Sequence, residues 1–592
     1  MSDTPNLNEQ LGVSSIVWRL SDLYPAADSK LLKDDRTWCE TEATAIHDEF
    51  RGRVKTLEAG EIFALVKRLE ELEVKIGSLA TYGFLNFITQ VGDSAASALY
   101  QMVQELANAC ATKTIFFKLE WNTIDEDRAK ALVRDEVLAP YRHYLTSMRR
   151  FRPHQLAEGE EKILIETNLV GRSGWNTLFE KVIGHLRFGD KLRTEEELLS
   201  ELYHPDREVR KEAAGDLTDG LGKNNHILTH IYNTLAADKM ISDRLRSYPS
   251  WISSMNLSNQ VDDATVDTLI EVVTGRYELV QRYYRVKRDL LELDTLFDYD
   301  RYAPVPGLPD KKFSWDECRA IVLKGFGAFS PRMEGAADRF FTESWIHAPV
   351  QQGKRGGAFA HPCVPSVHPY IMVNYTGTAR DVSTVAHELG HGVHQVLAAE
   401  QGYYNGNTPL VLAETASVFA EFLVFQAQLK LIDDDHQRRA FICQKLESIF
   451  ATVFRQVAMN RFEHLMHEGR RERGELSSET LSEFWLQTQQ EMFGDAVTLR
   501  DEYRIWWSYI PHFLHTPGYV YSYAFGELLV LALYNIYQRQ GDSFIPAYFD
   551  LLAAGGSATP QELLSAFGIS LSDAKFWQQG MEVIEALVAE VE

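Results

Sequence analysis

The stretch Asp381-Val-Ser-Thr-Val-Ala-His-Glu-Leu-Gly-His-Gly-Val-His394 decides how the rest of the chain is interpreted. Asp381 belongs to the residue types that cap helix N-termini, so we expect a helix to begin there. On that helix His387 and His391 are four residues apart and therefore lie on one face, one turn from each other. Two imidazole rings placed in this way can reach the same ion.

The pattern H-E-x-x-H over residues 387–391 favours a hydrolytic zinc site. Glu388 is rotated by roughly 100° from His387 on the helix, so its carboxylate can accept a proton from water without binding the metal. His394 follows three residues after His391, and we favour a packed histidine there over a further ligand. We predict one zinc ion per chain, with cobalt and manganese as possible substitutes in vitro.

The alternative interpretation of this pattern is a chance occurrence on the surface of a structural helix. Gly390 and Gly392 argue against it, because each glycine costs up to about 1 kcal/mol relative to alanine inside a helix. A structural helix has no reason to carry that cost twice. The two glycines therefore indicate that another backbone or side chain approaches this helix closely.

A catalytic zinc needs a third protein ligand, and the residues that follow offer three glutamates. Glu414 and Glu421 lie seven residues apart in the apolar run from Leu412 to Phe422 and share one helix face. A carboxylate buried among apolar side chains requires a cationic partner, which a metal ion would supply. Glu400 lies near a helix end, beside a glycine, and we expect it to be solvated.

Most of the chain has the spacing of amphipathic helices. Apolar residues recur at three- and four-residue steps over residues 62–79, and the same pattern runs over residues 440–465 without Pro or Gly. Between about residues 353 and 378, glycines and prolines punctuate short extended runs such as residues 370–375. We predict a mainly α fold with a small β-sheet next to the helix that carries His387.

Length and charge limit the architecture and the partners. The 592 residues exceed the size at which a single hydrophobic core stops growing, so we expect at least two subdomains. The formal charge of −24 disfavours nucleic acids and anionic membranes, which are bound through clustered Lys and Arg. The most apolar run, residues 525–537, falls short of the roughly 20 apolar residues that span a bilayer. We predict no nucleic acid partner and no membrane partner.

The cysteines and the first residues indicate a compartment. The five cysteines are scattered and form no C-x-x-C pair, which suits a reducing environment. Residues 1–9, Met-Ser-Asp-Thr-Pro-Asn-Leu-Asn-Glu, lack the basic and apolar regions of a signal peptide. We expect a cytoplasmic protein, and the sequence leaves its oligomeric state open.

Six segments, taken in order, point to one family. They are Trp18–Pro25, Gly353–Phe359, Pro369–Gly377, Asp381–His394, Ala413–Glu421, and Ile510–Phe513 followed by Tyr519–Gly526. In this order they resemble the thimet oligopeptidase and oligoendopeptidase F family of zinc peptidases, in its oligoendopeptidase F branch. The resemblance spans most of the chain.

The resemblance implies a two-lobed helical clamshell with the zinc at the base of a deep substrate channel. Such a channel admits short unstructured peptides and excludes folded proteins. The resemblance also implies His387, His391 and Glu414 as the metal ligands. We divide the chain into an N-terminal helical lobe, residues 1–200, and a catalytic region, residues 201–592, that contributes to both lobes.

The resemblance further implies which side chains stabilise the oxyanion formed during peptide hydrolysis. The family uses a histidine and tyrosines of a flexible segment, and His512, Tyr519 and Tyr523 are the matching positions. Residues 516–519 read Thr-Pro-Gly-Tyr where mammalian members carry a Gly-Gly-Tyr loop, so Tyr521 is an alternative donor and a candidate substrate contact. The other interpretation is that these tyrosines pack on a helix face with their hydroxyls in solvent.

Gly356 and Gly357 are candidate substrate-binding residues. Their segment resembles the strand that pairs with the backbone of bound peptide in this family. Glycines would let that backbone approach closely and would leave the hydrogen-bonding groups of a strand available. An ordinary hairpin turn is the alternative.

We therefore predict a zinc-dependent endopeptidase that hydrolyses internal bonds of short peptides. Two alternatives stay open. One is an aminopeptidase or carboxypeptidase, which would trim single residues from a free end. The other is a catalytically silent peptide-binding protein. The presence of Glu388 argues against this alternative, because a silent scaffold needs no general base. The cleavage-site preference, the maximum peptide length and the physiological substrate stay open.

Overall fold

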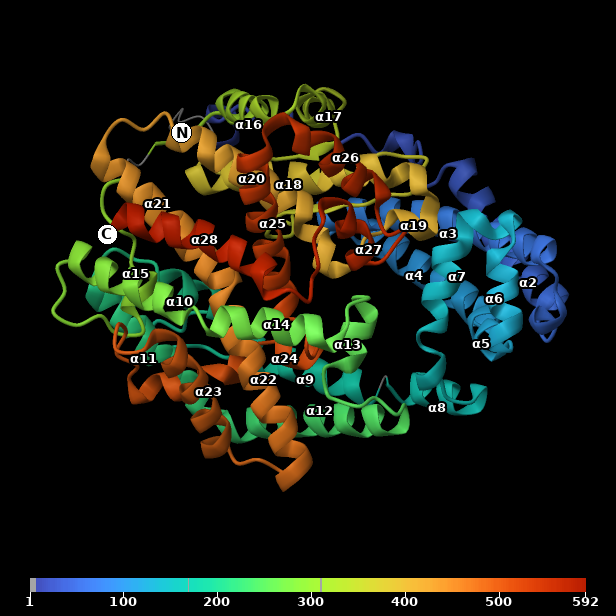
Figure 1. Cartoon of the computed structure of the whole chain (residues 1–592), viewed down its shortest axis with the longest axis horizontal. Helices are drawn as coiled ribbons and strands as arrows, with labels where there is room; N and C mark the ends of the chain where they lie inside the picture. Colours follow the sequence, from blue (N-terminus) through green and yellow to red (C-terminus); the bar gives the residue numbers. More distant parts are fainter. Residues whose placement is uncertain (1–6, 169, 309–310) are drawn as a thin grey trace. The chain divides into compact units, whose positions relative to one another are not determined.

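The computed structural model describes residues 7–168, 170–308 and 311–592, and helices dominate it (Figure 1). The mainly α prediction is confirmed. The chain folds into two compact units, each assembled from three separated stretches. Unit 1 consists of Met1–Arg152, Asp310–Leu431 and Tyr537–Gly568, and unit 2 of Pro153–Pro309, Ile432–Ile536 and Ile569–Glu592. The predicted division into residues 1–200 and 201–592 follows a different boundary and stays a prediction.

The α-helices of the two units are as follows. Unit 1 contains α1 (Leu7–Gln10), α2 (Lys30–Phe50), α3 (Ala59–Ile88), α4 (Ser94–Thr114), α5 (Phe116–Thr123), α6 (Glu126–Arg134), α7 (Arg142–Arg149), α16 (Trp315–Phe329), α17 (Pro331–Thr342), α18 (Ala379–Ala398), α19 (Gly402–Gly406), α20 (Leu410–Leu429), α26 (Ile545–Ala554) and α27 (Pro560–Leu564). Unit 2 contains α8 (Glu158–Asn168), α9 (Arg172–His185), α10 (Glu195–Glu201), α11 (Arg207–Lys223), α12 (Asn225–Leu245), α13 (Ser253–Ser258), α14 (Asp263–Thr274), α15 (Tyr277–Leu290), α21 (Asp435–Thr452), α22 (Phe454–Arg473), α23 (Ser478–Phe493), α24 (His512–His515) and α28 (Ala574–Val591). The helix α25 (Tyr521–Gln540) runs across the boundary between Ile536 and Tyr537.

A small sheet lies in unit 1. Its strand β3 (Tyr370–Met372) pairs in parallel with β1 (Ile346–His347) and antiparallel with β2 (Phe359–His361), so the order is β1-β3-β2. The central strand β3 is fully buried. Both β2 and β3 contact α18. The predicted sheet next to the helix of His387 is confirmed, and β1 lies just before the predicted range.

The helix α18 begins with a capping box. The Oγ1 of Thr378 accepts a hydrogen bond from the backbone N–H of Asp381 at 3.1 Å. In return the Asp381 carboxylate accepts the backbone N–H of Thr378 at 2.9 Å. Reciprocal bonds of this kind satisfy two donors that a helix start leaves unpaired. The prediction that Asp381 is the N-cap is therefore wrong by three positions, because Thr378 holds that place.

The predicted helical segments differ in outcome. The apolar residues that recur at three- and four-residue steps are all buried on one face of α3: Ile62, Leu65, Val66, Leu69, Leu72, Ile76 and Leu79. The pattern over residues 440–465 instead covers parts of two helices, α21 and α22. They are separated at Val453, a turn residue whose φ of −97° and ψ of −71° stay in the right-handed region but depart from regular helix values. Since Val453 is neither Pro nor Gly, the sequence gives no local signal for this break.

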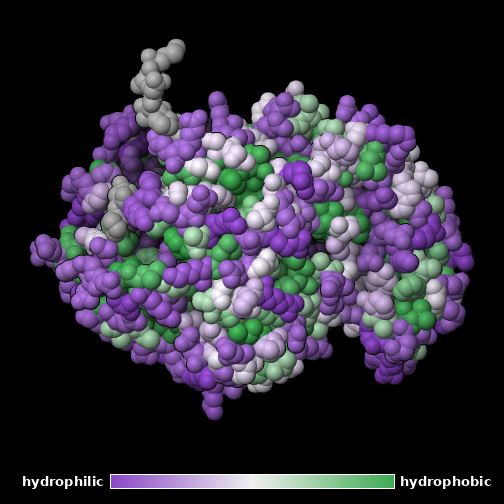
Figure 2. All heavy atoms as spheres, turned by 90° about the horizontal axis from the view of Figure 1, so that it is seen from above, coloured by the Kyte–Doolittle hydropathy of each residue, from purple (hydrophilic) through white to green (hydrophobic). Residues whose placement is uncertain are grey.

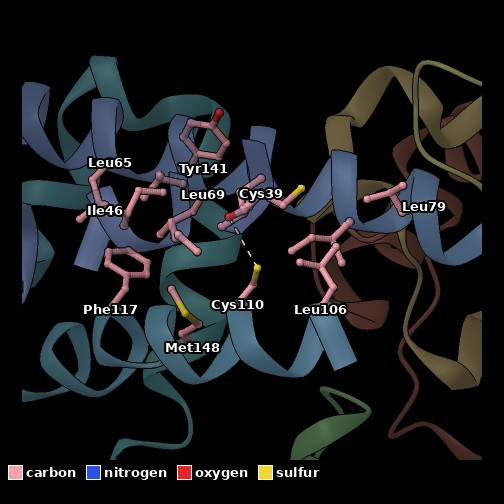
Figure 3. Close-up of a cluster of buried hydrophobic side chains, with 14 of the residues drawn as sticks. Cys39, Ile46, Leu65, Leu69, Leu79, Leu106, Cys110, Phe117, Tyr141 and Met148 are labelled. Carbon is pink, nitrogen blue, oxygen red and sulfur yellow. Dashed lines mark hydrogen bonds between the residues drawn. The ribbon is translucent and has the colours of Figure 1, made fainter. Parts of the chain in front are cut away.

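The helical cores of unit 1 are apolar and contain free thiols. Figure 3 shows the cluster formed by α2, α3 and their neighbours, in which the Cys110 thiol donates a hydrogen bond to the carbonyl of Cys39 at 3.6 Å. Burial raises the pKa of the Cys39 thiol to about 12. All five cysteines of the chain are free. A thiol protonated in this way is inert and serves as a small apolar side chain.

One helix in the described residues, α20, is long and apolar enough to cross a membrane. The sequence interpretation placed the most apolar run at residues 525–537 and missed it. Within the protein, 67% of the apolar window of α20 is buried. A helix that is hydrophobic all round fits the interior of a large protein, and α20 packs against α16 and α18. The surface seen in Figure 2 is mainly hydrophilic, as the excess of Asp and Glu predicts.

Candidate metal centre

The centre is built where α18 and α20 pack side by side in unit 1 (Figure 1). A Cβ added to Gly390 would lie 2.5 Å from the carbonyl oxygen of Ala416 and 2.5 Å from the Cα of Ser417. A Cβ on Gly392 would lie 2.5 Å from the ring of Phe340 in α17. The prediction that these glycines mark close approaches is confirmed.

Three side chains converge in the space between these helices. His387 and His391 come from α18 and Glu414 from α20, with one ligand atom of each within 4.8 Å of the others. The Oε2 of Glu414 is 3.3 Å from Nε2 of His387 and 3.5 Å from Nε2 of His391. Ligand atoms that lie about 2.0–2.1 Å from a tetrahedral zinc are about 3.4 Å apart. The donor set and its spacing therefore fit a zinc ion.

Two further residues of α20 hold the ligand side chains in place. The hydroxyl of Ser417 donates a hydrogen bond to Oε2 of Glu414 at 2.7 Å. The Oε2 of Glu421 is 3.4 Å from Nδ1 of His387, the ring nitrogen that does not face Glu414. A carboxylate at this position fixes the orientation and tautomer of a metal-binding imidazole. Two of the three candidate glutamates thus belong to the centre, whereas Glu400 lies beyond α18 and is exposed.

We expect Glu421→Gln to lower the affinity for zinc by about 10- to 100-fold, because the amide is a weaker acceptor for the His387 N–H than the carboxylate is. Competition with a chromogenic chelator measures this affinity. Glu400→Gln removes the same charge from an exposed site and should leave the affinity unchanged. An unaltered zinc affinity in Glu421→Gln would show that this carboxylate does not support the ligand.

The carboxylates and burial around the two histidines shift the pKa values of the three candidate ligands. Burial lowers the pKa of His387, but the hydrogen bond to Glu421 and the charges of Glu414 and Glu388 outweigh it and raise the pKa to about 9. Burial lowers the pKa of His391 despite the nearby Glu414. The pKa of Glu414 is lowered, because the two histidines outweigh its burial. Metal binding at neutral pH must therefore release a proton from His387.

Glu388 lies beside the ligands without being one of them. Its side chain is buried, and burial raises its pKa to about 7, against the effects of His387 and of the backbone N–H of Ala360. Ala360 is the middle residue of β2, so the sheet contributes to holding this carboxyl group. A carboxyl group with a pKa near neutrality can both accept and return a proton.

His394 is enclosed on α18 and is not part of the ligand cluster. Burial is the main cause that lowers its pKa to about 4, so the ring is neutral at physiological pH. Among the described residues its Nε2 has no hydrogen-bond partner. The structure thus places His394 as a packed histidine.

The candidate residues for oxyanion stabilisation, His512, Tyr519, Tyr521 and Tyr523, all lie within unit 2. The hydroxyl of Tyr523 is 3.4 Å from Nε2 of His512, and the rings of Tyr519 and Tyr523 meet edge to face with centroids 4.9 Å apart. Tyr521 is fully buried, and its hydroxyl accepts a hydrogen bond from Asn259 at 2.8 Å. Its hydroxyl is thus enclosed and already engaged. The action of these residues on the oxyanion stays a prediction.

Gly356 and Gly357 lie in a bend, and the strand begins only at Phe359. Gly357 has a φ of +83°, a left-handed conformation that belongs to turns, and its carbonyl accepts a hydrogen bond from Asn374 at 2.9 Å. The placement of both glycines within a strand is therefore wrong. Both are exposed, and their contact with substrate stays a prediction.

Sequence reasoning missed a buried carboxyl group that supports the tyrosine segment. Glu463 of α22 is fully buried and accepts the backbone N–H of Gly518 at 2.9 Å, one residue before Tyr519. Gly518 has a φ of +80°, and a Cβ there would lie 3.3 Å from Ile252. This contact joins residues 55 positions apart, and no local sequence pattern around Glu463 predicts it.

Glu463 should make the stability of unit 2 fall as the pH rises from about 4.5 to about 8. Burial raises the pKa of its carboxyl group from 4.5 to about 8. A raised pKa stabilises the fold below the unfolded value, and this contribution is lost as the pH rises through the folded value. In the wild type, the free energy of unfolding should fall by up to about 1.4 kcal/mol per pH unit between about pH 4.5 and 8. In Glu463→Gln this part of the pH dependence should be absent.

Urea unfolding of the wild type and of Glu463→Gln across this pH range measures the difference. Glu472→Gln changes an exposed glutamate on the same helix and should keep the wild-type slope. Parallel pH dependences of the wild type and Glu463→Gln would show that Glu463 is already ionised in the folded protein.

A helix that carries H-E-x-x-H and meets a glutamate from a neighbouring helix defines the class of metal-dependent peptidases. Residues 200–583 match Peptidase family M3, and residues 120–188 match Oligopeptidase F. The chain belongs to peptidase family M3. The resemblance found in the sequence is confirmed, and the family assigns a peptide-hydrolysing metallopeptidase activity to the chain.

Curated relatives and a solved structure agree with this family. Oligopeptidase PepF of Bacillus subtilis is 26% identical over 592 residues, which cover 97% of this chain and 86% of that protein. An oligoendopeptidase F homolog of Lactococcus lactis is 25% identical and covers 98% and 97% of the two chains. The crystal structure of oligoendopeptidase-F from Enterococcus faecium superimposes with a TM-score of 0.73 at 21% identity, covering 96% of this chain and 99% of that one.

Proposed function

We propose that the chain is a cytoplasmic, zinc-dependent oligoendopeptidase that cuts internal bonds of short unstructured peptides and leaves folded proteins intact. The observation that carries zinc dependence is the convergence of His387, His391 and Glu414 at the spacing of zinc ligands. Support for internal cleavage of short peptides comes from the similarity to proteins named oligoendopeptidase F.

The chain's own residues divide the chemistry between them. A bound zinc ion would supply Lewis-acid polarisation of the scissile carbonyl. Glu388 would take the proton of the attacking water and deliver it to the nitrogen of the leaving peptide. His512 with Tyr519 or Tyr523 would donate hydrogen bonds to the oxyanion, and each such donor is typically worth about 10²–10³ in kcat.

Two other functions make different demands on the site. An exopeptidase needs a group that recognises a free peptide terminus next to the metal. A silent peptide-binding protein needs neither the metal nor Glu388. A buried carboxyl group beside two histidines carries a desolvation cost, which a binding scaffold gains nothing by keeping.

Product mapping separates these functions. Unstructured peptides of graded length, incubated with zinc-loaded and chelator-stripped protein, are expected to show internal cuts by mass spectrometry. These cuts should be restricted to short peptides, vanish on stripping and return with added zinc, and a folded substrate should stay intact. Stepwise loss of terminal residues would identify an exopeptidase. Absence of metal-dependent cleavage across a diverse peptide set would identify the silent binding protein.

A further inference from the structure

A cavity of about 70 Å³ lies entirely within unit 2. Its lining residues include neither the candidate metal ligands nor His512, Tyr519 and Tyr523. Its polar lining side chains are Tyr203, Tyr284, Arg301, Tyr302, Glu447 and Arg455. Tyr203 is 56% exposed, so solvent reaches this wall of the cavity. The volume suits a few atoms, such as those of a small anion.

Arg301 brings an unpaired positive charge to this cavity. Its side chain is buried, and in the described part of the chain it forms no ion pair with a carboxylate. One guanidinium nitrogen donates to the hydroxyl of Tyr302 at 2.7 Å, and the group lies over the rings of Tyr302 and Tyr503 at 4.5 Å and 4.9 Å. The aromatic faces offset part of the cost of burial. The Nε–H of Arg301 has no hydrogen-bond partner among the described residues.

Arg455 of α22 brings a second unpaired charge. Within residues 7–168, 170–308 and 311–592 it makes no hydrogen bond or ion pair, and its Nε is enclosed without a partner. The charge of Arg455 helps to lower the pKa of His512, so the two side chains are near each other in unit 2.

The carboxylate at the cavity is already engaged. Glu447 accepts hydrogen bonds from the ammonium group of Lys287 and from the hydroxyl of Tyr283, the latter at 2.5 Å. Lys287 is itself fully buried, so the Glu447 charge neutralises that cation. The cavity therefore keeps the two positive charges of Arg301 and Arg455 in a chain whose net charge is −24. Keeping a second positive charge close to the buried Arg301 without an anion is costly.

We propose that this cavity is a binding site for one small oxyanion, held between Arg301 and Arg455 and assisted by the hydroxyl of Tyr302. Planar guanidinium groups match the two oxygens of a carboxylate or a phosphate with paired charge-assisted hydrogen bonds. The oxyanion is either the carboxylate at the C-terminus of a peptide or free inorganic phosphate. The site is argued from unit 2 alone and does not rest on the proposed peptidase function.

Isothermal titration calorimetry of the full-length, zinc-loaded protein tests the proposal. The probes are inorganic phosphate, N-acetylglycine as a small carboxylate, and N-acetylglycinamide as its uncharged counterpart. We expect saturable binding of at least one of the two anions and none of the amide. Arg455→Gln and Arg301→Gln should weaken this binding at least about tenfold, because each removes a charged donor pair.

Two control variants locate the binding. Arg244→Gln removes an exposed arginine of α12, outside the cavity, and should leave anion binding unchanged. His391→Ala should lose zinc and still bind the anion, so binding to the metal centre is recognised by its loss in this variant. Arg301 is buried and Arg455 only partly buried, so Arg455→Gln alone tests the proposal if Arg301→Gln does not fold.

Each outcome decides one point. Binding of phosphate alone assigns the site to a free inorganic anion, and binding of N-acetylglycine but not its amide assigns it to a peptide carboxylate. Peptides with free and amidated C-termini, compared in the same titration, then show whether the carboxylate of a peptide C-terminus is bound. The proposal is overturned if neither anion saturates the wild type, or if Arg455→Gln binds them as the wild type does.

Discussion

Replacing Glu388 with glutamine is expected to abolish peptide hydrolysis while zinc stays bound. Glutamine keeps the size of the side chain and its contact with β2 but cannot take a proton from water. Loss of a positioned general base typically costs about 10²–10⁴ in rate. The three ligand side chains are not changed, so the zinc content should stay at one ion per chain. Turnover of an internally quenched peptide and elemental analysis of the purified variant measure the two properties.

The matched control is Glu400→Gln, which removes one carboxylate from an exposed position near the end of the same helix. It should retain both activity and metal. If Glu388→Gln loses zinc, Glu388 is a ligand and the assignment of Glu414 must be revised. If Glu388→Gln keeps its activity, another group accepts the proton of the attacking water.

The parts of the centre that follow from local sequence were predictable. The spacing of His387 and His391 on one helix depends only on the 3.6-residue period. The unfavourable Gly390 indicated a close neighbour, and the neighbour is α20. Residue chemistry set Glu400 aside as solvated and left the identity of the third ligand open between Glu414 and Glu421. It is decided by the pairing of α18 with α20, a tertiary contact that places Glu414 and Glu421 on two different nitrogens of the His387 ring.

The features that sequence reasoning missed have a common physical origin. Glu463 contacts Gly518, and Arg301 and Arg455 line one cavity, only because distant segments pack within unit 2. Charged residues on a helix usually face solvent, so their burial shows only in the folded chain. The start of α18 was missed for a subtler reason. Thr378 and Asp381 are both residues that cap helices, and the capping box uses both, with their roles set by which one precedes the first turn.

Gly390→Ala is expected to destabilise unit 1 and to weaken zinc binding together. The added Cβ would lie 2.5 Å from backbone atoms of Ala416 and Ser417, whereas ordinary contacts begin at 3.4 Å. Backbone atoms cannot rotate away, so α18 and α20 must move apart by on the order of 1 Å. Overpacking of this kind costs typically about 1–3 kcal/mol. Urea unfolding and a chelator competition measure the stability and the zinc affinity.

The zinc affinity should fall because the helices that separate carry different ligands. Glu414 moves with α20 while His387 stays on α18, and metal–ligand distances tolerate only about 0.2 Å. Gly335→Ala in α17 is the matched control, since no atom lies within 4 Å of its added Cβ. There alanine should raise stability by up to about 1 kcal/mol and leave zinc binding unchanged. A Gly390→Ala variant that gains stability in the same way would mean that α20 does not lie against α18 at this glycine, and the position of Glu414 as a ligand would fall with that contact.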